Sequence, residues 1–319
     1  MTKLLITRNL PQDVLEAAKV LADVTVREDQ SPMSAQEAAE MLQAYDVILP
    51  TLGDRFNAAA FDAAPIPRCK MLANFGVGYN HIDVSAAQKA GVSVSNTPGA
   101  VTDATADIAM SLILMSCRRL GEGERMVRAN AWEGWHPTQL LGMHIGGKTL
   151  GIIGMGRIGK AIARRAAAGF EMNVIFYNRS TVDAPEHGTQ VPEISQVLGA
   201  SDVVVLAVPA TPQTHRLMNA ERFEQMQHHA HLVNIARGDV VDEAALVDAL
   251  QSGQIAGAGL DVYEREPVVS EALLQMENVA LLPHLGTAAL EVRVDMGMMA
   301  VRNVAAHING AALPNPILP

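Results

Sequence analysis

The feature that most constrains the fold is a glycine-rich loop between a predicted strand and a predicted helix. Residues 149–153 form an apolar run of strand length, and Gly154, Gly156 and Gly159 follow it before a helical pattern over Lys160–Ala168. In this arrangement the first glycine allows a tight turn, the second lets a pyrophosphate approach the backbone, and the third packs the helix against the sheet. Free N–H groups at the start of the helix attract phosphate. A purely structural turn is the alternative, but the flanking strand and helix favour a dinucleotide site.

Short apolar runs alternate with amphipathic helical stretches along the chain, which is typical of parallel sheets covered by helices. The first series predicts strands at Lys3–Thr7, Val24–Arg27, Asp46–Pro50, Cys69–Asn74 and Val92–Ser95, and helices at Pro11–Ala22, Ala35–Ala44 and Val84–Ala90. Ser34 and Glu37 have the spacing of a capping box for the second of these helices.

A long helical pattern from Thr102 to Ala129 precedes the second series. That series predicts strands at Thr149–Gly154, Asn173–Tyr177, Asp202–Val208, His231–Asn234, Gly257–Asp261 and Val279–Leu282, and the chain ends with a helical stretch over Ala288–Ile308. The predicted fold class is therefore α/β, with two doubly wound parallel-sheet domains: a Rossmann-type cofactor domain and a flavodoxin-like substrate domain.

Composition limits the function classes. Of the 319 residues, 49% are hydrophobic and 18% charged, which suits about two folded domains. The 34 acidic residues outnumber the 24 basic ones, and this argues against a nucleic-acid partner. The longest apolar segment, 104–117, is interrupted by polar residues and is shorter than the roughly 20 residues that a membrane span needs. The spacing of Cys69 and Cys117 matches no metal-binding or redox motif. Residues 1–14 lack the apolar stretch of a signal peptide. We therefore expect a cytoplasmic protein.

The end of the second strand in the cofactor domain indicates which dinucleotide binds. This position usually carries an Asp or Glu that accepts hydrogen bonds from the ribose 2′-hydroxyl. Here the strand is followed by Asn178, Arg179 and Ser180. No carboxylate is present to repel a 2′-phosphate, and Arg179 and Ser180 can donate hydrogen bonds to one. NADPH is therefore the predicted cofactor, while the alternative, in which Arg179 only stacks on adenine, allows NADH as well.

Three polar side chains, Arg237, Glu266 and His284, follow predicted strands of the second series. The carboxyl ends of parallel strands meet at the ligand-binding edge of an open α/β sheet, so we expect these side chains at one edge. A keto acid needs a guanidinium for its carboxylate, a general acid beside its carbonyl oxygen and a hydride donor on its face. A neighbouring carboxylate favours a protonated imidazole, which suits His284 to the acid role. Alone, His284 would be an ordinary strand-end histidine as often as a catalyst, but the set predicts catalysis.

An ordered series of motifs covers essentially the whole chain. It comprises Gly76–Asp83, Thr97–Gly99, Thr105–Asp107, Gly151–Gly159, Asn234–Gly238, Gly259–Pro267 and Pro283–Gly286. With these motifs the chain resembles the D-2-hydroxyacid dehydrogenase family, and within it the glyoxylate and hydroxypyruvate reductases. The resemblance implies that Arg237 orients the substrate, that His284 is the acid and base, and that Glu266 pairs with it. It also implies that the backbone N–H groups of Val77 and Gly78 receive the substrate carboxylate.

The resemblance further implies which residues line the cofactor beyond the glycine loop and the 178–180 segment. They are Thr105, Arg157, Ile158, Val208, Pro209, Ala236, Asp261, His284, Gly286 and Thr287. Two positions depart from the family's pattern. Ile235 stands where the family commonly has Thr and so lacks its hydroxyl, and Asn178 stands where the NAD-specific members have an acidic residue.

In that family the first domain is discontinuous and the chain forms a homodimer. The resemblance therefore implies a substrate-binding domain of residues 1–98 and 288–319 and a dinucleotide-binding domain of residues 99–287, with the substrate in a cleft between them. The Trp132–Pro137 segment resembles the family's dimerisation arm, from which Trp135 would reach the partner subunit's substrate pocket. Plain dimer packing is the alternative role for that tryptophan.

Together these observations predict an NADPH-preferring reductase that converts a small 2-keto acid, glyoxylate or hydroxypyruvate, into a D-2-hydroxy acid. The paired Glu266 and His284 count against a formate dehydrogenase, whose hydride transfer needs no proton donor. A phosphoglycerate dehydrogenase or a dinucleotide-sensing corepressor is the other alternative, although neither a regulatory extension nor interaction tails are expected in this chain. Three histidines lie within residues 228–231, but no Cys or carboxylate set completes a metal site, so we expect a solvated turn and no bound metal.

Overall fold

The computed structural model forms two compact units, one discontinuous and one continuous in sequence. It describes residues 1–183 and 188–318. The units are Met1–Val101 with Ala288–Pro319 (unit 1) and Thr102–Thr287 (unit 2). The division falls after Val101 and not at the predicted residue 98, because helix α5 of unit 2 begins only at Thr102. The last residue of the predicted substrate-binding domain, Pro319, lies outside the described residues.

Unit 1 is built on a five-stranded parallel sheet. Its strands are β1 (Lys3–Ile6), β2 (Asp23–Val26), β3 (Val47–Leu49), β4 (Met71–Ala73) and β5 (Ser93–Ser95). Their spatial order is β2-β1-β3-β4-β5, and every neighbouring pair is parallel. This is the doubly wound order of flavodoxin-like folds, so the fold class predicted for the substrate domain is confirmed. Strands β3 and β4 are buried along their whole length, as expected when helices cover both faces.

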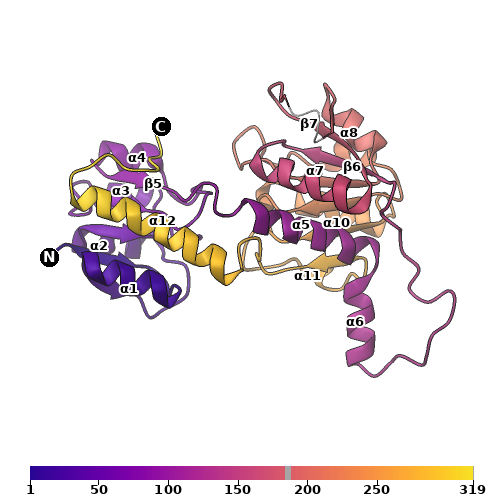
Figure 1. The fold of residues 1–319 in the computed structure, drawn as a ribbon, viewed down its shortest axis with the longest axis horizontal. Coiled ribbons are helices and arrows are strands. Elements are labelled where there is room, and N and C mark those ends of the chain that lie inside the picture. The colour runs from indigo at the N-terminus through magenta and orange to yellow at the C-terminus, as the bar shows by residue number, and fades with distance from the viewer. Residues whose placement is uncertain (184–187, 319) are drawn as a thin grey trace. The chain divides into compact units, whose positions relative to one another are not determined.

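The helices of unit 1 divide between the two faces of this sheet (Figure 1). They are α1 (Gln12–Leu21), α2 (Ala35–Ala44), α3 (Ala58–Ala63), α4 (Val84–Lys89) and α12 (Leu290–Ile308). Helices α2, α3 and α4 share one core with the sheet, whereas α1 and α12 pack against each other. A Cβ atom at Gly297 would lie 2.4 Å from a methyl group of Val14, so this glycine sets how closely α1 and α12 approach.

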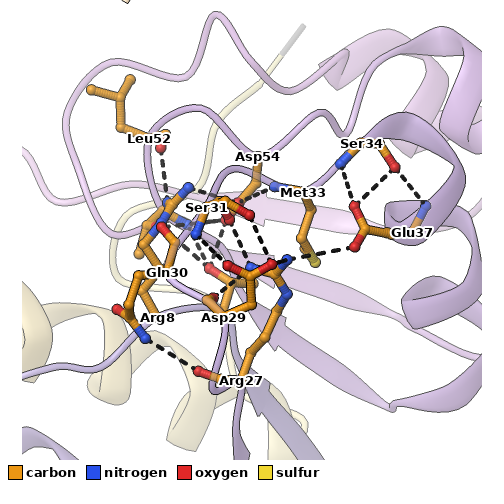
Figure 2. Close-up of polar contacts among 12 residues, drawn as sticks. Arg8, Arg27, Asp29, Gln30, Ser31, Met33, Ser34, Glu37, Leu52 and Asp54 are labelled. Atoms are coloured by element: carbon orange, nitrogen blue, oxygen red, sulfur yellow. Dashed lines mark hydrogen bonds and ion pairs between the residues drawn. The ribbon is translucent and has the colours of Figure 1, made fainter. Parts of the chain in front are cut away.

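Capping explains where two of these helices begin. The predicted capping box of α2 is confirmed: the Ser34 N–H donates to the Glu37 carboxylate at 2.8 Å and the Glu37 N–H donates to Ser34 Oγ at 3.2 Å (Figure 2). Helix α3 was not among the predicted helices. Its six residues are too few to show a helical period, but the Asn57 side chain caps its first turn by accepting from the Ala60 N–H.

A buried carboxylate ties together the carboxyl ends of β1 and β3 (Figure 2). Asp54 is fully buried and accepts hydrogen bonds from Thr7 Oγ1 at 2.6 Å, from the Thr51 N–H at 2.9 Å and from the Met33 N–H at 3.1 Å. Arg8 forms an ion pair with the same carboxylate at 3.2 Å. Because a buried charge is costly unless it is paired and hydrogen-bonded, these partners make the loop after β3 a fixed part of the sheet edge.

Unit 2 is built on a seven-stranded parallel sheet. Its strands are β6 (Thr149–Ile153), β7 (Asn173–Tyr177), β8 (Thr189–Gln190), β9 (Val203–Leu206), β10 (His231–Asn234), β11 (Gly257–Leu260) and β12 (Val279–Leu281). The spatial order is β12-β11-β10-β9-β6-β7-β8, which is the Rossmann order with one strand added. The Rossmann-type fold class is therefore confirmed. The prediction of six strands was wrong by one, because β8 has only two residues and no apolar run.

The helices of unit 2 cover both faces of its sheet. They are α5 (Thr102–Cys117), α6 (Leu120–Arg128), α7 (Arg157–Phe170), α8 (Ile194–Ala200), α9 (Ala220–Glu224), α10 (Glu243–Gln251) and α11 (Glu271–Leu274), with a 3₁₀ turn at Gly238–Val240. Helices α5 and α7 share one core, and α8, α9 and α10 share another. Among the described residues, no helix has both the length and the apolar character needed to cross a lipid bilayer.

The predicted long helix after residue 102 is broken into two. Arg119 adopts a left-handed backbone conformation, with φ of 53°, between α5 and α6. Because the left-handed conformation cannot continue a right-handed helix, the chain changes direction there. Helix α5 has buried residues along its length, whereas α6 has none. In Figure 1, α6 extends away from the sheet of unit 2.

Candidate active site

The glycine loop connects β6 to α7 and has the shape that a dinucleotide site requires. Gly154 has φ of +103°, and a Cβ there would lie 2.6 Å from the carbonyl oxygen of Ala207, directly after the neighbouring strand β9. A Cβ at Gly159 would lie 2.2 Å from the Gly154 carbonyl oxygen, whereas Gly156 faces open space. Helix α7 begins at Arg157, earlier than predicted, and no side chain caps it. Its first N–H groups are therefore left for an anion, which fits a pyrophosphate.

The 178–180 segment follows β7 and contacts the glycine loop directly. Asn178 Oδ1 accepts from the Met155 N–H at 3.2 Å, and Asn178 Nδ2 donates to the Ser180 carbonyl oxygen at 3.0 Å. Gln190 on β8 donates to the carbonyl oxygens of Asn178 and Ser180, both at 3.1 Å. Sequence reasoning missed Gln190, since nothing in the local pattern relates β8 to this turn. Arg179 is exposed beside it.

Arg237 follows β10 in a turn that the buried Asn234 side chain stabilises. Asn234 Nδ2 donates to the Arg237 carbonyl oxygen and Asn234 Oδ1 accepts from the Ala236 N–H, each at 3.0 Å. The guanidinium donates to the Ala236 carbonyl oxygen at 2.7 Å. Burial lowers the pKa of Arg237, while the negative charges of Glu266 and Asp239 act in the opposite direction. Arg237 is thus a partly buried cation in a fixed turn.

Glu266 and His284, which follow β11 and β12, form a hydrogen-bonded pair. His284 Nδ1 and Glu266 Oε2 are 2.8 Å apart. Burial raises the pKa of Glu266, but hydrogen bonds from His284 and from the Tyr263 N–H, with the charge of Arg237, outweigh burial and hold that pKa below its usual value. The structure therefore brings the predicted pair together, and Glu266 presents a carboxylate to the imidazole.

The turn that carries His284 is held by groups from elsewhere in unit 2. His284 has φ of 56°, a left-handed conformation that costs a non-glycine residue about 1–3 kcal/mol. Asp261, only 1% exposed, accepts from the Leu285 N–H at 2.6 Å and from the Gly286 N–H at 2.8 Å. Thr105 on α5 donates to the Gly286 carbonyl oxygen at 3.0 Å. Asp261 and Thr105 were predicted to line the cofactor, and here their side chains fix the turn of the histidine.

The two residues predicted to bind the substrate carboxylate lie in unit 1. Val77 and Gly78 belong to the loop that follows β4, and both are partly exposed. Trp135, predicted to reach a partner subunit, is 79% exposed in the segment after α6, which contains neither helix nor strand.

The three histidines within residues 228–231 were predicted to lie in a solvated turn, and the structure agrees for only part of this segment. His229 is exposed and pairs with Asp202 at 2.8 Å, but His231 begins β10 and is buried. His231 Nδ1 lies 2.7 Å from Ser116 Oγ, and burial lowers the pKa of His231 to about 4. Both histidines line a cavity of about 690 Å³ that contains none of the predicted site residues. No group of three or more potential metal ligands was found in the described part of the chain.

Comparison with known proteins assigns this geometry to a family. Residues 110–286 match the family described as "D-isomer specific 2-hydroxyacid dehydrogenase, NAD binding domain". This chain belongs to that family. It is accordingly an oxidoreductase with a nicotinamide dinucleotide cofactor, and the family resemblance noted from its motifs is confirmed.

Individual relatives of this dehydrogenase cover nearly all of it. A glyoxylate reductase of Thermococcus onnurineus is 43% identical over 318 residues, which are 98% of this chain and 94% of that protein. The structure of a glyoxylate reductase from Paecilomyes thermophila has 33% identity and a TM-score of 0.86, covering 99% of this chain and 98% of that one. An NADPH-dependent glyoxylate/hydroxypyruvate reductase from Sinorhizobium meliloti, in complex with NADP and malonate, has 35% identity and a TM-score of 0.86, covering 99% and 96%.

Proposed function

We propose that this dehydrogenase is an NADPH-preferring reductase of small 2-keto acids, with glyoxylate and hydroxypyruvate as substrates and D-2-hydroxy acids as products. The observation that carries the proposal is the 2.8 Å pair of His284 and Glu266, in the same unit as the partly buried Arg237 cation and the glycine loop. A proton donor, a carboxylate-binding cation and a dinucleotide loop are the groups that reduction of a keto acid needs. The names of the relatives support the same substrates.

Each group has one role in the proposed mechanism. The glycine loop and the 178–180 segment would hold the cofactor, which supplies a hydride when it is bound and reduced. Arg237 binds the substrate carboxylate and fixes the orientation of the carbonyl group. The family resemblance assigns the N–H groups of Val77 and Gly78, in unit 1, to binding of the substrate carboxylate. His284 gives its proton to the carbonyl oxygen as the alcohol forms, and the Glu266 carboxylate stabilises the imidazolium before that transfer.

A substrate panel tests this proposal. Glyoxylate, hydroxypyruvate, pyruvate and 3-phosphohydroxypyruvate would each be assayed with NADPH and with NADH, and formate with the oxidised cofactors. We expect the highest kcat/KM with glyoxylate or hydroxypyruvate. A marked preference for the phosphorylated acid, turnover of formate alone, or no reduction of any keto acid would overturn the proposed function.

The proposed preference for NADPH over NADH leads to a separate prediction. A hydrogen bond to a charged group contributes about 1.5–3 kcal/mol, so one contact from the exposed Arg179 to a 2′-phosphate favours NADPH by roughly tenfold to a hundredfold. Arg179→Ala should remove most of this preference by weakening NADPH binding. Asn178→Asp should instead repel the 2′-phosphate and offer NADH a ribose partner.

The measurement is the ratio of kcat/KM for the two cofactors at one saturating keto-acid concentration. Arg164→Ala is a matched control, because it removes an exposed arginine of the same unit from helix α7, where it pairs with Asp103, and not from the glycine loop or the 178–180 segment. A wild-type ratio near one, or in favour of NADH, would contradict the role given to Arg179.

We further propose a homodimer formed through α6 and the segment after it. Helix α6 has no buried residue, and the large apolar side chains of Val127, Trp132, Trp135 and Leu141 are exposed. Exposed apolar groups gathered in one segment are typical of an interaction surface. Light scattering should give about twice the 34.0 kDa chain mass. A monomeric mass at assay concentration would contradict the proposal.

A further inference from the structure

The loop after β4 in unit 1 is held by two asparagine side chains. Asn74 Nδ2 donates to the carbonyl oxygens of Gly76 and Gly78, both at 3.0 Å. Asn96 Nδ2 donates to the carbonyl oxygen of Val77 at 2.8 Å. Three successive peptide carbonyls therefore each have a side-chain amide as donor.

These bonds determine where the loop's N–H groups point. A peptide group is planar and trans, so the N–H of one residue is directed opposite to the C=O of the residue before it. The Val77 N–H therefore points away from Asn74, which holds the Gly76 oxygen, and the Gly78 N–H points away from Asn96, which holds the Val77 oxygen. Within the described residues, neither N–H donates to a protein acceptor. Both remain available to a ligand.

Asn74 is placed in a way that packing alone does not explain. It is fully buried, and its Oδ1 atom has no hydrogen-bond partner. An unsatisfied buried polar atom costs free energy that an apolar residue of similar size would avoid. The two hydrogen atoms of Nδ2, in contrast, are both used on loop carbonyls. The contribution that this asparagine makes is thus the orientation of the loop.

Both asparagines have anchored backbones. The Asn74 N–H donates to the Ser95 carbonyl oxygen at 2.9 Å, and the Asn96 N–H donates to the Asn315 carbonyl oxygen at 3.2 Å. The side-chain donors are therefore attached to the carboxyl ends of β4 and β5 and not to the loop itself. A loop held in this way keeps one set of peptide orientations before the substrate arrives, which lowers the cost of binding.

We propose that Asn74 and Asn96 are positioning residues for the substrate carboxylate: they orient the peptide groups of residues 76–78 so that the Val77 and Gly78 N–H groups face it. This inference rests on the proposed function, which assigns those N–H groups to the carboxylate. Neither asparagine contacts the substrate in this scheme, and each acts through the backbone.

Asn74→Asp is the sharpest test, because it keeps the shape of the side chain and replaces the donor with an oxygen that repels the Gly76 and Gly78 carbonyls. The KM for the keto acid should rise about tenfold to a hundredfold, since a hydrogen bond to a carboxylate is lost or misdirected. The KM for NADPH and kcat at saturating keto acid should change by less than about threefold. Oxalate, a carboxylate inhibitor, should bind the NADPH-loaded protein correspondingly more weakly in calorimetry.

Asn96→Asp provides a second variant at a partly exposed site, where folding is less at risk. It should raise the same KM by disturbing the Val77 carbonyl. Ser34→Ala is the matched control, because it removes the cap of α2 in unit 1 and costs stability without touching the loop. We expect Ser34→Ala to lower the melting temperature and to leave the keto-acid KM unchanged.

Two outcomes separate the inference from the function on which it rests. If the wild-type protein reduces keto acids and both asparagine variants keep its KM and oxalate affinity, the positioning role is wrong and the proposed function stands. If Ser34→Ala raises the KM as much as they do, the effect is general destabilisation and the inference is equally wrong. A wild-type protein that reduces no keto acid would overturn the proposed function itself.

Discussion

His284→Ala is expected to lower kcat for keto-acid reduction by about 10²–10⁴, because it removes the group proposed to donate a proton to the carbonyl oxygen. The KM for NADPH should change little, since the glycine loop and the 178–180 segment are unaffected. Steady-state kinetics with glyoxylate and a separate cofactor titration measure the two effects. Wild-type turnover in His284→Ala, on every keto acid that the parent reduces, would show that another group supplies the proton.

Glu266→Gln is the companion variant, because it keeps the shape of the His284 partner and removes its charge. The lowered pKa of Glu266 means that this carboxylate is ionised at neutral and mildly acidic pH, where it favours the imidazolium. Without that charge the positive charge of a protonated imidazole is less stabilised. The alkaline limb of kcat/KM for reduction should therefore move to lower pH, while the plateau at acidic pH falls less than in His284→Ala. An unchanged pH profile would exclude Glu266 from the proposed role.

Gly238→Ala should damage both stability and activity, because the backbone of a neighbouring turn leaves no room for a Cβ. That atom would lie 1.8 Å from the Tyr263 carbonyl carbon and 2.3 Å from the Glu264 nitrogen. Main-chain atoms cannot rotate aside as a side chain does, so the turns carrying Arg237 and Glu266 must separate. We expect a loss of about 3 kcal/mol in the free energy of unfolding, which lowers Tm by roughly 6–12 °C. A displacement of about 1 Å between these turns should also lower kcat/KM about a hundredfold.

Gly169→Ala is the control for this variant. Gly169 lies on α7 in the same unit, and a Cβ there would have no atom within 4 Å. Alanine should stabilise that helix by about 0.5–1 kcal/mol and leave the kinetics unchanged. Thermal melts and kcat/KM of the two variants, measured side by side, check the prediction. A Gly238→Ala protein with the wild-type Tm and kcat/KM would mean that the two turns are not in contact in solution.

Local sequence patterns were sufficient for the fold class and for the principal catalytic candidates. Apolar runs alternating with helical periods predicted both parallel sheets, and the glycine spacing identified the strand and helix that flank a dinucleotide loop. In a parallel sheet every strand ends at the same edge, so topology alone places the residues after β10, β11 and β12 together. That rule predicts that Glu266 and His284 lie near each other, and the structure places them 2.8 Å apart.

The ends of helices and strands, and the interruptions between them, were predicted less accurately than the fold class, because each depends on very few residues. The break at Arg119 depends on one left-handed residue inside a continuous helical pattern, and β8 is too short to have a period. Neither feature changes the apolar spacing from which the helices and strands were predicted.

What the sequence by itself determined was therefore the fold class and which residues are candidates for the chemistry, because residue type and the succession of strands along the chain are local properties. Only the tertiary structure decided what holds them: Asp261 and Thr105 at the turn of His284, Gln190 at the cofactor turn, and Asn74 at the loop of Val77. Most of these contacts join residues that are far apart in the chain, and all depend on the direction in which a side chain points. Such partners become apparent only when packing has brought the strand ends together, since hydrogen bonds require distance and direction that no spacing in the sequence encodes.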